Sequence, residues 1–178
     1  MASDLLSAEA LQRMVIQSEL TRLGAEYSIA VDDHDIECVL DCFTDDGSFE
    51  RAGSVHTGRY TLRSFYIAMM DRYRFTRHVP ETLVIRDADD TEVVSLTTGS
   101  AELLYGDTLM RAAYRYHDTC RLDDGRWRYA RRKLDFLYVV PAEAMSASMV
   151  DRNRIRWPDA PPSPADFPES LPTWETYR

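Results

Sequence analysis

Long apolar runs are missing from this sequence: none reaches the roughly 18–20 residues that a membrane-spanning helix needs. The first residues, MASDLLSAEA, carry acidic side chains where a secretory signal carries positive charge. Cysteine is scarce too, because Cys38, Cys42 and Cys120 are too few and too unevenly spaced for a disulfide framework. These absences predict a soluble protein of the reducing cytoplasm, with no signal peptide and no membrane partner.

Positive charge is also in short supply. The 178 residues carry a formal net charge of -9 and contain no basic stripe, which argues against a nucleic-acid partner because such binding depends on cations that neutralise phosphates. No His, Cys or carboxylate cluster has metal-ligand spacing, and neither a glycine-rich phosphate loop nor a G-x-S-x-G turn is present. Cys38 and Cys42 miss the C-x-x-C redox spacing, so core packing is expected for both. We predict no metal and no cofactor.

The first third of the chain has helical periodicity. Leu20, Leu23 and Tyr27 recur at helical spacing and predict a long helix that begins after Ser7 and ends near Asp32. A short helix is expected over residues 35–43, followed by a turn at 45–47, and Thr61 is expected to cap a third helix.

From His78 onward the pattern changes to strands. Four long strands are predicted, over residues 78–86, 91–104, 109–122 and 126–140. Their tight connections indicate an antiparallel meander. We therefore predict an α+β fold in residues 1–150: a strongly curved antiparallel sheet, shaped as a cone with one open end, packed against about three N-terminal helices.

Residues 151–178 form a different kind of segment. They contain six of the eight prolines, which excludes regular helix or central strand over most of their length. We expect an extended arm rather than a separate domain. Trp157, Phe167 and Trp174 make it unusually apolar, so the arm is either disordered or packed over its own domain or a neighbouring subunit.

The residues with the clearest chemistry are Asp32, at the end of the long helix, and His78, at the start of the first long strand. An aspartate that accepts a hydrogen bond from one imidazole nitrogen fixes the tautomer and makes the other nitrogen a stronger base. The alternative is a capping aspartate and a histidine bound to backbone groups. Asp33, His34 and Asp35 are expected to be solvated.

A cavity is predicted on the concave face of the sheet. If Thr97 points inward, strand alternation brings Ser95, Gly99 and Ala101 to the same face, and such small side chains leave volume unfilled. Phenols directed into an apolar cavity can donate hydrogen bonds to a developing enolate oxygen. Besides Thr97, the candidates for substrate contact are therefore Tyr27, Tyr66, Tyr114 and Tyr116, each of which can instead be ordinary core.

The order of the motifs resembles a known family. A long helix ending in AVD, a short helix ending in CFTDDGSFE, a helix GRYTLRSFY and a strand GRWRYARRKLDF resemble the SnoaL-like branch of the nuclear transport factor 2-like superfamily, over about residues 8–140. Within it, scytalone dehydratase, hexachlorocyclohexane dehydrochlorinase and a bile-acid dehydratase have an aspartate and a histidine at the positions of Asp32 and His78. A second catalytic histidine of scytalone dehydratase falls near Thr97 here, a departure from the two-histidine scheme that leaves a single-base elimination or isomerisation open.

Together these features favour a cofactor-independent dehydratase, isomerase or cyclase that uses Asp32 and His78 on a small, apolar, oxygenated polyketide, terpenoid or steroid-like molecule. The alternatives are epoxide opening by an activated water and a non-catalytic small-molecule-binding or assembly subunit. Val94, Leu96 and Leu109 leave the convex face partly apolar, which predicts a homo-oligomer. The resemblance favours a trimer or a dimer.

Overall fold

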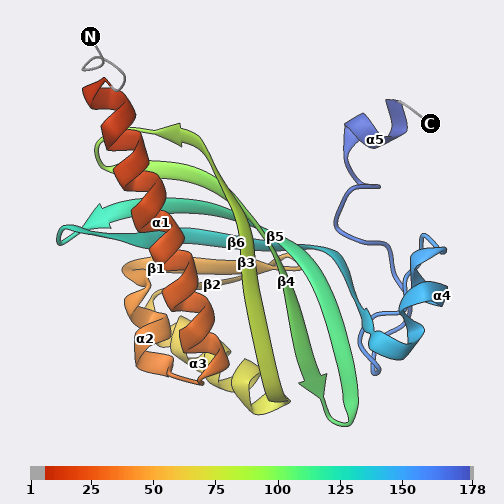
Figure 1. The fold of residues 1–178 in the computed structure, drawn as a ribbon. Coiled ribbons are helices and arrows are strands. Elements are labelled where there is room, and N and C mark those ends of the chain that lie inside the picture. The colour runs from red at the N-terminus through yellow and green to blue at the C-terminus, as the bar shows by residue number, and fades with distance from the viewer. Residues whose placement is uncertain (1–6, 177–178) are drawn as a thin grey trace.

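The computed structural model describes residues 7–176, in which helices pack on one curved sheet (Figure 1). The N-terminal helices are α1 (Ala8–Asp32), α2 (Ile36–Asp41) and α3 (Arg59–Arg72). The strands are β1 (Phe43–Arg51), β2 (Ser54–Thr57), β3 (Tyr73–Ala88), β4 (Glu92–Tyr105), β5 (Thr108–Asp123) and β6 (Arg126–Pro141). The C-terminal segment holds η1 (Ala142–Ala144), α4 (Met145–Met149) and α5 (Pro172–Thr176). The α+β prediction is confirmed.

The six strands lie in the order β2-β1-β6-β5-β4-β3. The four long strands pair antiparallel, as predicted from their tight turns. However, β1 pairs parallel with β6, so the sheet is mixed and the expectation of a purely antiparallel sheet was wrong. The reason is topological: the chain leaves β1 through β2 and α3 and enters the meander at the far edge, which brings β6 back beside β1 in the same direction.

The end of α1 is built to stop the helix at Asp32. His34 has a positive φ of 58°, a backbone conformation in which histidine is enriched among residues other than glycine. This reversal lets the backbone N–H of Asp35 donate to the carbonyl of Ala30 at 2.9 Å, and the Asp35 carboxylate then accepts from Cys38 N–H and caps α2. Asp32 therefore occupies the last turn of α1, beside the sheet.

Three predicted boundaries were wrong. The turn expected at 45–47 lies inside β1, where the register shifts between Phe43 and Ser48. A Cβ at Gly47 would lie 2.8 Å from two backbone carbonyl oxygens, so the chain makes a bulge there that requires glycine. Helix α3 begins at Arg59, after Gly58 with φ 82°, and not at Thr61.

The third displaced boundary concerns His78. Strand β3 begins at Tyr73, directly after α3, so His78 lies within the strand and not at its start. The early part of the strand was missed because Arg74, Phe75 and Arg77 are all exposed, so the segment lacks the alternation that identifies a strand. This extension of β3 brings Thr76 and His78 to one face of the strand, opposite the end of α1.

The core lies between the helices and the concave face of the sheet. Helix α1 packs against β3 and β6, while α3 packs against β1, β2 and β3. The predicted stripe of Leu20, Leu23 and Tyr27 is buried. The alternation predicted for β4 is also observed. Cys42 is buried, but Cys38 is exposed, so the core position expected for Cys38 was wrong: it lies on the outer side of the short helix α2.

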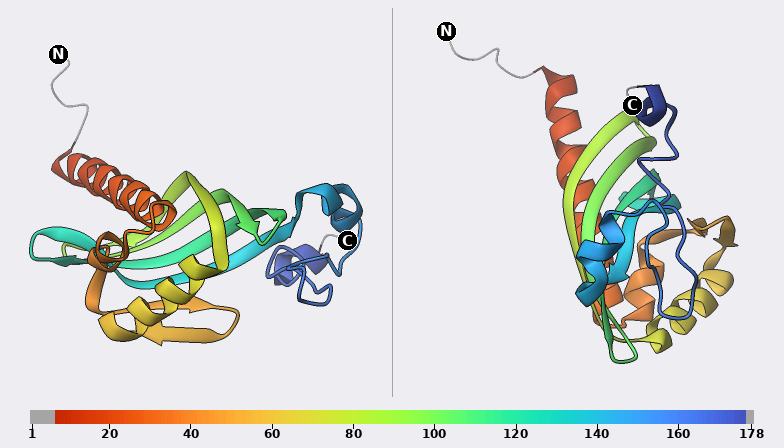
Figure 2. Two further views of the ribbon diagram at one scale, coloured as in Figure 1. Left: turned by 90° about the horizontal axis from the view of Figure 1, so that it is seen from below. Right: turned by 90° about the vertical axis from the view of Figure 1, so that its right-hand side faces the viewer.

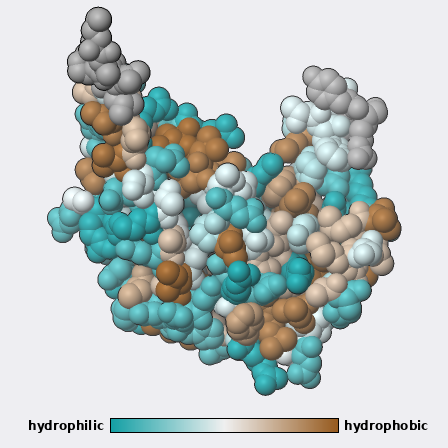
Figure 3. Space-filling model, in the orientation of Figure 1, coloured by the Kyte–Doolittle hydropathy of each residue, from teal (hydrophilic) through white to brown (hydrophobic). Residues whose placement is uncertain are grey.

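The segment after β6 sits at the end of the sheet away from the N-terminus of α1 (Figure 2). No helix in the part of the chain that the structure describes combines the length and apolarity needed to cross a membrane. Apolar surface gathers beside the N-terminal half of α1 (Figure 3), where a groove between α1 and β3 is lined in part by Met14, Leu83, Val84 and Ile85.

Candidate active site

Asp32 and His78 meet between the end of α1 and β3. The distance between Asp32 Oδ1 and His78 Nδ1 is 2.7 Å. The backbone N–H of His78 donates to Asp32 Oδ2 at 2.8 Å, and the Thr76 hydroxyl donates to Oδ1 at 2.8 Å. The Thr76 hydroxyl and the backbone N–H are donors to this carboxylate, and an ionised carboxylate can only accept hydrogen bonds. Nδ1 of His78 therefore carries the proton, and Nε2 is left with the lone pair when the ring is neutral.

Hydrogen bonding controls the charge of Asp32. Burial by itself raises the pKa of Asp32, but the hydrogen bonds from the His78 ring and backbone and from Thr76 outweigh it and hold the pKa below the usual value. His78 borders the cavity described below, whereas Asp32 does not. The imidazole ring therefore stands between a stable carboxylate and the cavity.

The lowered pKa of Asp32 predicts how stability depends on pH. A carboxyl group with a depressed folded-state pKa stabilises the fold above its ordinary value of about 3.9, and this stabilisation is lost as pH falls through the folded-state pKa. In urea unfolding, the difference in free energy of unfolding between the wild type and Asp32→Asn should be largest near neutral pH and shrink in acid. Asp33→Asn, at the exposed neighbouring position, should follow the wild type throughout. A difference for Asp32→Asn that is independent of pH would contradict the assignment.

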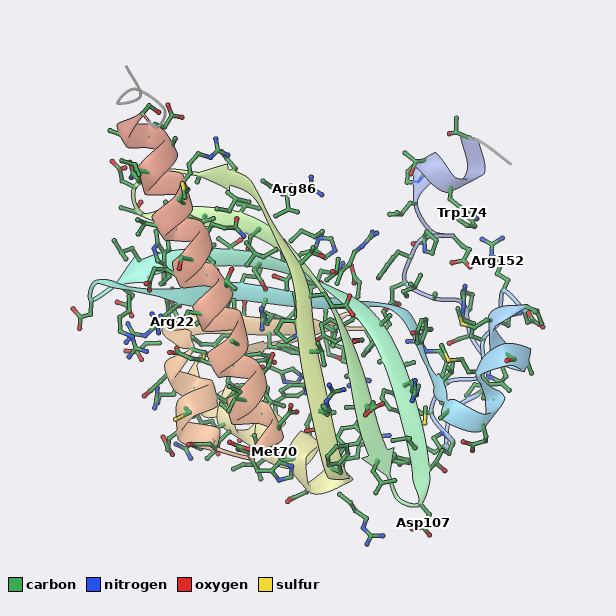
Figure 4. The ribbon with its side chains drawn as sticks, in the orientation of Figure 1. Arg22, Met70, Arg86, Asp107, Arg152 and Trp174 are labelled. Atoms are coloured by element: carbon green, nitrogen blue, oxygen red, sulfur yellow. The ribbon has the colours of Figure 1, made fainter. Side chains whose placement is uncertain are left out.

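The cavity beside His78 encloses about 80 Å³ and is mainly aromatic and apolar. Helix α3 supplies one wall of the cavity. Met70, in this wall, is labelled in Figure 4 near the end of α3. The apolar and aromatic lining of the cavity consists of Tyr27, Val31, Phe49, Phe65, Tyr66, Met69, Met70, Tyr73, Leu103, Tyr116, Leu134, Phe136 and Trp157. The remaining lining residues are His34, Arg51, Thr76 and His78. His34 is exposed, as expected, and yet borders the cavity.

Three of the four tyrosines singled out from the sequence line this cavity. The hydroxyls of Tyr27 and Tyr66 lie 2.9 Å apart and form a hydrogen bond, and the ring of Tyr116 stands 6.1 Å from that of Tyr27. Burial is the main reason why the pKa values of all three phenols are raised well above 10. These hydroxyls are therefore neutral hydrogen-bond donors at physiological pH.

Thr97 and Tyr114 do not reach the cavity. Both are buried on the concave face, and Ser95, Gly99 and Ala101 share that face as expected. The space over these small residues is nevertheless filled: a Cβ added to Gly99 would lie 2.5 Å from the Tyr114 ring. The cavity opens instead nearer the start of β3, where α3 and β6 border it.

Beneath the tyrosines lies a buried ion pair that sequence reasoning left unassigned. Arg132 Nε and Nη2 donate to the two carboxylate oxygens of Asp118 at 2.9 and 2.8 Å, and both side chains are 1% exposed. The guanidinium also lies 4.4, 3.9 and 3.7 Å from the ring centroids of Tyr27, Tyr116 and Tyr129. Cation–π contacts of this kind stabilise a desolvated cation and hold the phenol rings in place.

Sequence comparison now places the chain. The sequence pattern of the SnoaL-like domain matches residues 12–133. The chain belongs to the SnoaL-like family. The resemblance noted from the motifs is thereby confirmed. No protein with a curated description matches the sequence.

Solved structures share this SnoaL-like fold. A proposed scytalone dehydratase from Novosphingobium aromaticivorans is 19% identical over 85% of this chain and 94% of that one, with a TM-score of 0.70. A hexachlorocyclohexane dehydrochlorinase from Novosphingobium barchaimii is 17% identical over 74% and 92% of the two chains, with a TM-score of 0.66. The β subunit of a proposed aromatic-ring-hydroxylating dioxygenase from Novosphingobium aromaticivorans is 20% identical over 70% and 90%, with a TM-score of 0.61. At these identities the likeness concerns the fold alone.

Sequence reasoning missed several residues of this site, among them Thr76, Arg51 and Trp157. Thr76 was detectable in principle, because it precedes His78 by two positions and so faces the same side of the strand. Trp157 was not, because it comes from the C-terminal arm. Its indole packs against Tyr73, Tyr105 and Phe136, with ring centroids 6.0, 6.4 and 6.5 Å away. The arm therefore forms part of the cavity wall of its own chain.

Proposed function

We propose that this SnoaL-like protein is a cofactor-independent acid–base enzyme, a dehydratase, isomerase or cyclase, that acts on a small, mostly apolar, oxygenated molecule. The observation that carries the proposal is the hydrogen bond between Asp32 and His78 at the edge of an aromatic cavity. Polyketide, terpenoid and steroid-like compounds have the required character. The fold shared with a dehydratase and a dehydrochlorinase is compatible with this chemistry.

In the proposed reaction His78 is the base. Nε2 removes a proton from a carbon next to a carbonyl group, and Asp32 stabilises the imidazolium that forms. The proton then returns either to another carbon, which completes an isomerisation, or to a departing hydroxyl group, which completes a loss of water. One histidine can serve both steps, so the lack of a second histidine at Thr97 is no obstacle.

The tyrosines have the complementary role. As the carbon loses its proton, negative charge develops on the carbonyl oxygen, and a preorganised donor in a dry site stabilises it. The pair formed by Tyr27 and Tyr66 has two hydroxyl protons and uses one in its mutual hydrogen bond. The second proton is available to the substrate, whereas the hydroxyl of Tyr116, on the same cavity wall, already interacts with that of Tyr27.

Proton abstraction can be tested before the natural substrate is known. Bicyclic hydroxyketones and steroid enones are incubated with the protein in D₂O, and the loss of the proton signal next to the carbonyl is followed by NMR. At least one compound should exchange well above the buffer rate. If compounds bind, as judged by broadening of their own signals, but none exchanges faster than in buffer, the proposal is contradicted.

The alternatives receive less support. Epoxide opening needs carboxylates that position a water, and Asp32, behind His78, does not border the cavity. A non-catalytic subunit is compatible with the dioxygenase β subunit among the fold relatives, but it gives no reason for the contact between Asp32 and His78. Association into a dimer or trimer stays a prediction, resting on the exposed Val94 and the half-buried Leu96 and Leu109.

A further inference from the structure

Arg51, at the end of β1, brings a permanent positive charge to the cavity. Among the lining residues that the structure describes it is the one lysine or arginine, and no aspartate or glutamate accompanies it. The rest of the lining is apolar, phenolic or histidine and threonine. A chain with a net charge of -9 therefore presents a cation inside the cavity beside His78.

The surroundings of Arg51 leave this charge without a counterion. Its guanidinium carbon lies 5.3 Å from the Trp157 ring centroid and 5.4 Å from that of Phe136. Its polar contacts are with neutral side chains. Nη1 lies 4.0 Å from the Met69 sulfur, and the guanidinium also interacts with the hydroxyl of Tyr73. This interaction acts against burial, which raises the pKa of Tyr73. Within residues 7–176, no carboxylate forms an ion pair with Arg51.

Neighbouring arginines behave differently. Arg131, on the neighbouring strand β6, pairs with Glu50 at 2.5 Å. Arg72, which contacts the same Trp157 ring as Arg51, pairs with Asp159 at 3.2 Å. Carboxylate partners are therefore provided for both Arg131 and Arg72. Arg51 alone of these three faces the cavity without one.

We propose that Arg51 binds a carboxylate group of the substrate, which makes the substrate a small apolar acid. This inference rests on the proposed function and names the substrate class of the same site. Aromatic contacts occupy the faces of a guanidinium group and leave its N–H edge for a carboxylate, which the planar fork binds through two parallel hydrogen bonds. Lysine would lack this geometry.

The position of Arg51 also orients the substrate. Arg51 is on β1 and His78 is on β3, and three strands, β6, β5 and β4, separate them in the sheet. Neighbouring strands lie about 4.8 Å apart, so the two side chains approach the cavity from different sides even though the sheet is curved. A carboxylate held by Arg51 therefore leaves the opposite, uncharged end of the molecule to His78.

Equilibrium binding tests this inference without turnover. Cinnamate and its neutral isostere cinnamamide are titrated into the full chain at neutral pH by isothermal calorimetry. The wild type should bind cinnamate about tenfold more tightly or better. Arg51→Gln should abolish the preference, and Arg51→Lys should keep only part of it.

The matched control is Arg115→Gln. Arg115 also stands over an aromatic ring, that of Phe167 at 4.2 Å, but it does not border the cavity, so its replacement should leave the preference for cinnamate unchanged. Equal binding of the two compounds by the wild type, binding of neither at millimolar concentration, or a preference that survives Arg51→Gln would each overturn the inference.

The two proposals fail separately. His78→Ala should keep the preference for cinnamate, because carboxylate binding does not require the base. A preference that depends on Arg51 in a protein that exchanges no substrate proton would leave the inference standing and refute the enzyme. Proton exchange in a protein without a preference for the acid would support the enzyme and overturn the inference.

Discussion

Replacing His78 by alanine should lower the rate of proton exchange by about 10²–10⁴-fold, the usual contribution of a positioned general base. The variant removes Nε2 from the cavity. His34 also borders the cavity, but it follows the end of α1 and is not on β3. Folding should be retained, because Asp32 keeps the hydrogen bonds from Thr76 and from the backbone N–H of residue 78. The exchange rate and the thermal unfolding midpoint, measured on the same preparation, separate the two effects.

The control for this variant is His117→Ala. His117 also contacts an aspartate, with Nε2 at 3.3 Å from Asp135 Oδ2, but its side chain is 44% exposed and lies outside the cavity. This variant should exchange substrate protons as the wild type does. A rate of proton exchange in His78→Ala within a few-fold of the wild-type rate would contradict the role of His78 as the base.

Replacing Asp118 by alanine should destabilise the protein by about 3–5 kcal/mol, because it leaves the buried Arg132 guanidinium without its counterion. Burial alone would lower the pKa of Arg132, but Asp118 outweighs it and, with the surrounding tyrosines, keeps the arginine charged. In the variant the cation cannot escape this penalty by losing its proton, because a guanidinium group is not deprotonated in proteins. Urea unfolding at neutral pH measures the loss, and the same rings border the cavity, so activity should fall as well.

An exposed ion pair provides the comparison. Asp107 pairs with Arg74 at 3.3 Å, but the two side chains are 99% and 71% exposed, and water replaces such a contact with little loss. Asp107→Ala should leave the unfolding midpoint where it is. If Asp118→Ala were equally harmless, the pair formed by Asp118 and Arg132 would not be a structural element of the site.

Much of the fold was accessible from sequence because it depends on local periodicity. The spacing of Leu20, Leu23 and Tyr27 reports which side of a helix is buried, and the alternation around Thr97 reports which side of a strand is buried. Turn residues mark the connections of the meander. The contact between Asp32 and His78 was also foreseeable, because the family resemblance indicates which two positions meet, although His78 lies within β3 and not at its start.

The location of the cavity was not foreseeable. Small residues on a strand predict free volume only if nothing larger fills it, and the ring of Tyr114 lies directly over Gly99. Whether a neighbouring side chain fills a space depends on rotamers and on strand register, which periodicity does not contain. For the same reason, the sequence could not separate Tyr27, Tyr66 and Tyr116, which border the cavity, from Tyr114, which does not.

The sequence by itself determined the α+β class, the meander, the SnoaL-like resemblance and the pairing of Asp32 with His78. Only the tertiary structure decided that β1 runs parallel to β6, that Arg132 is buried under the tyrosines, and that Arg51 and Trp157 share a cavity wall. The physical reason is distance along the chain. Patterns within one element reflect the backbone and the solvent, whereas contacts between residues about a hundred positions apart depend on how the whole chain closes.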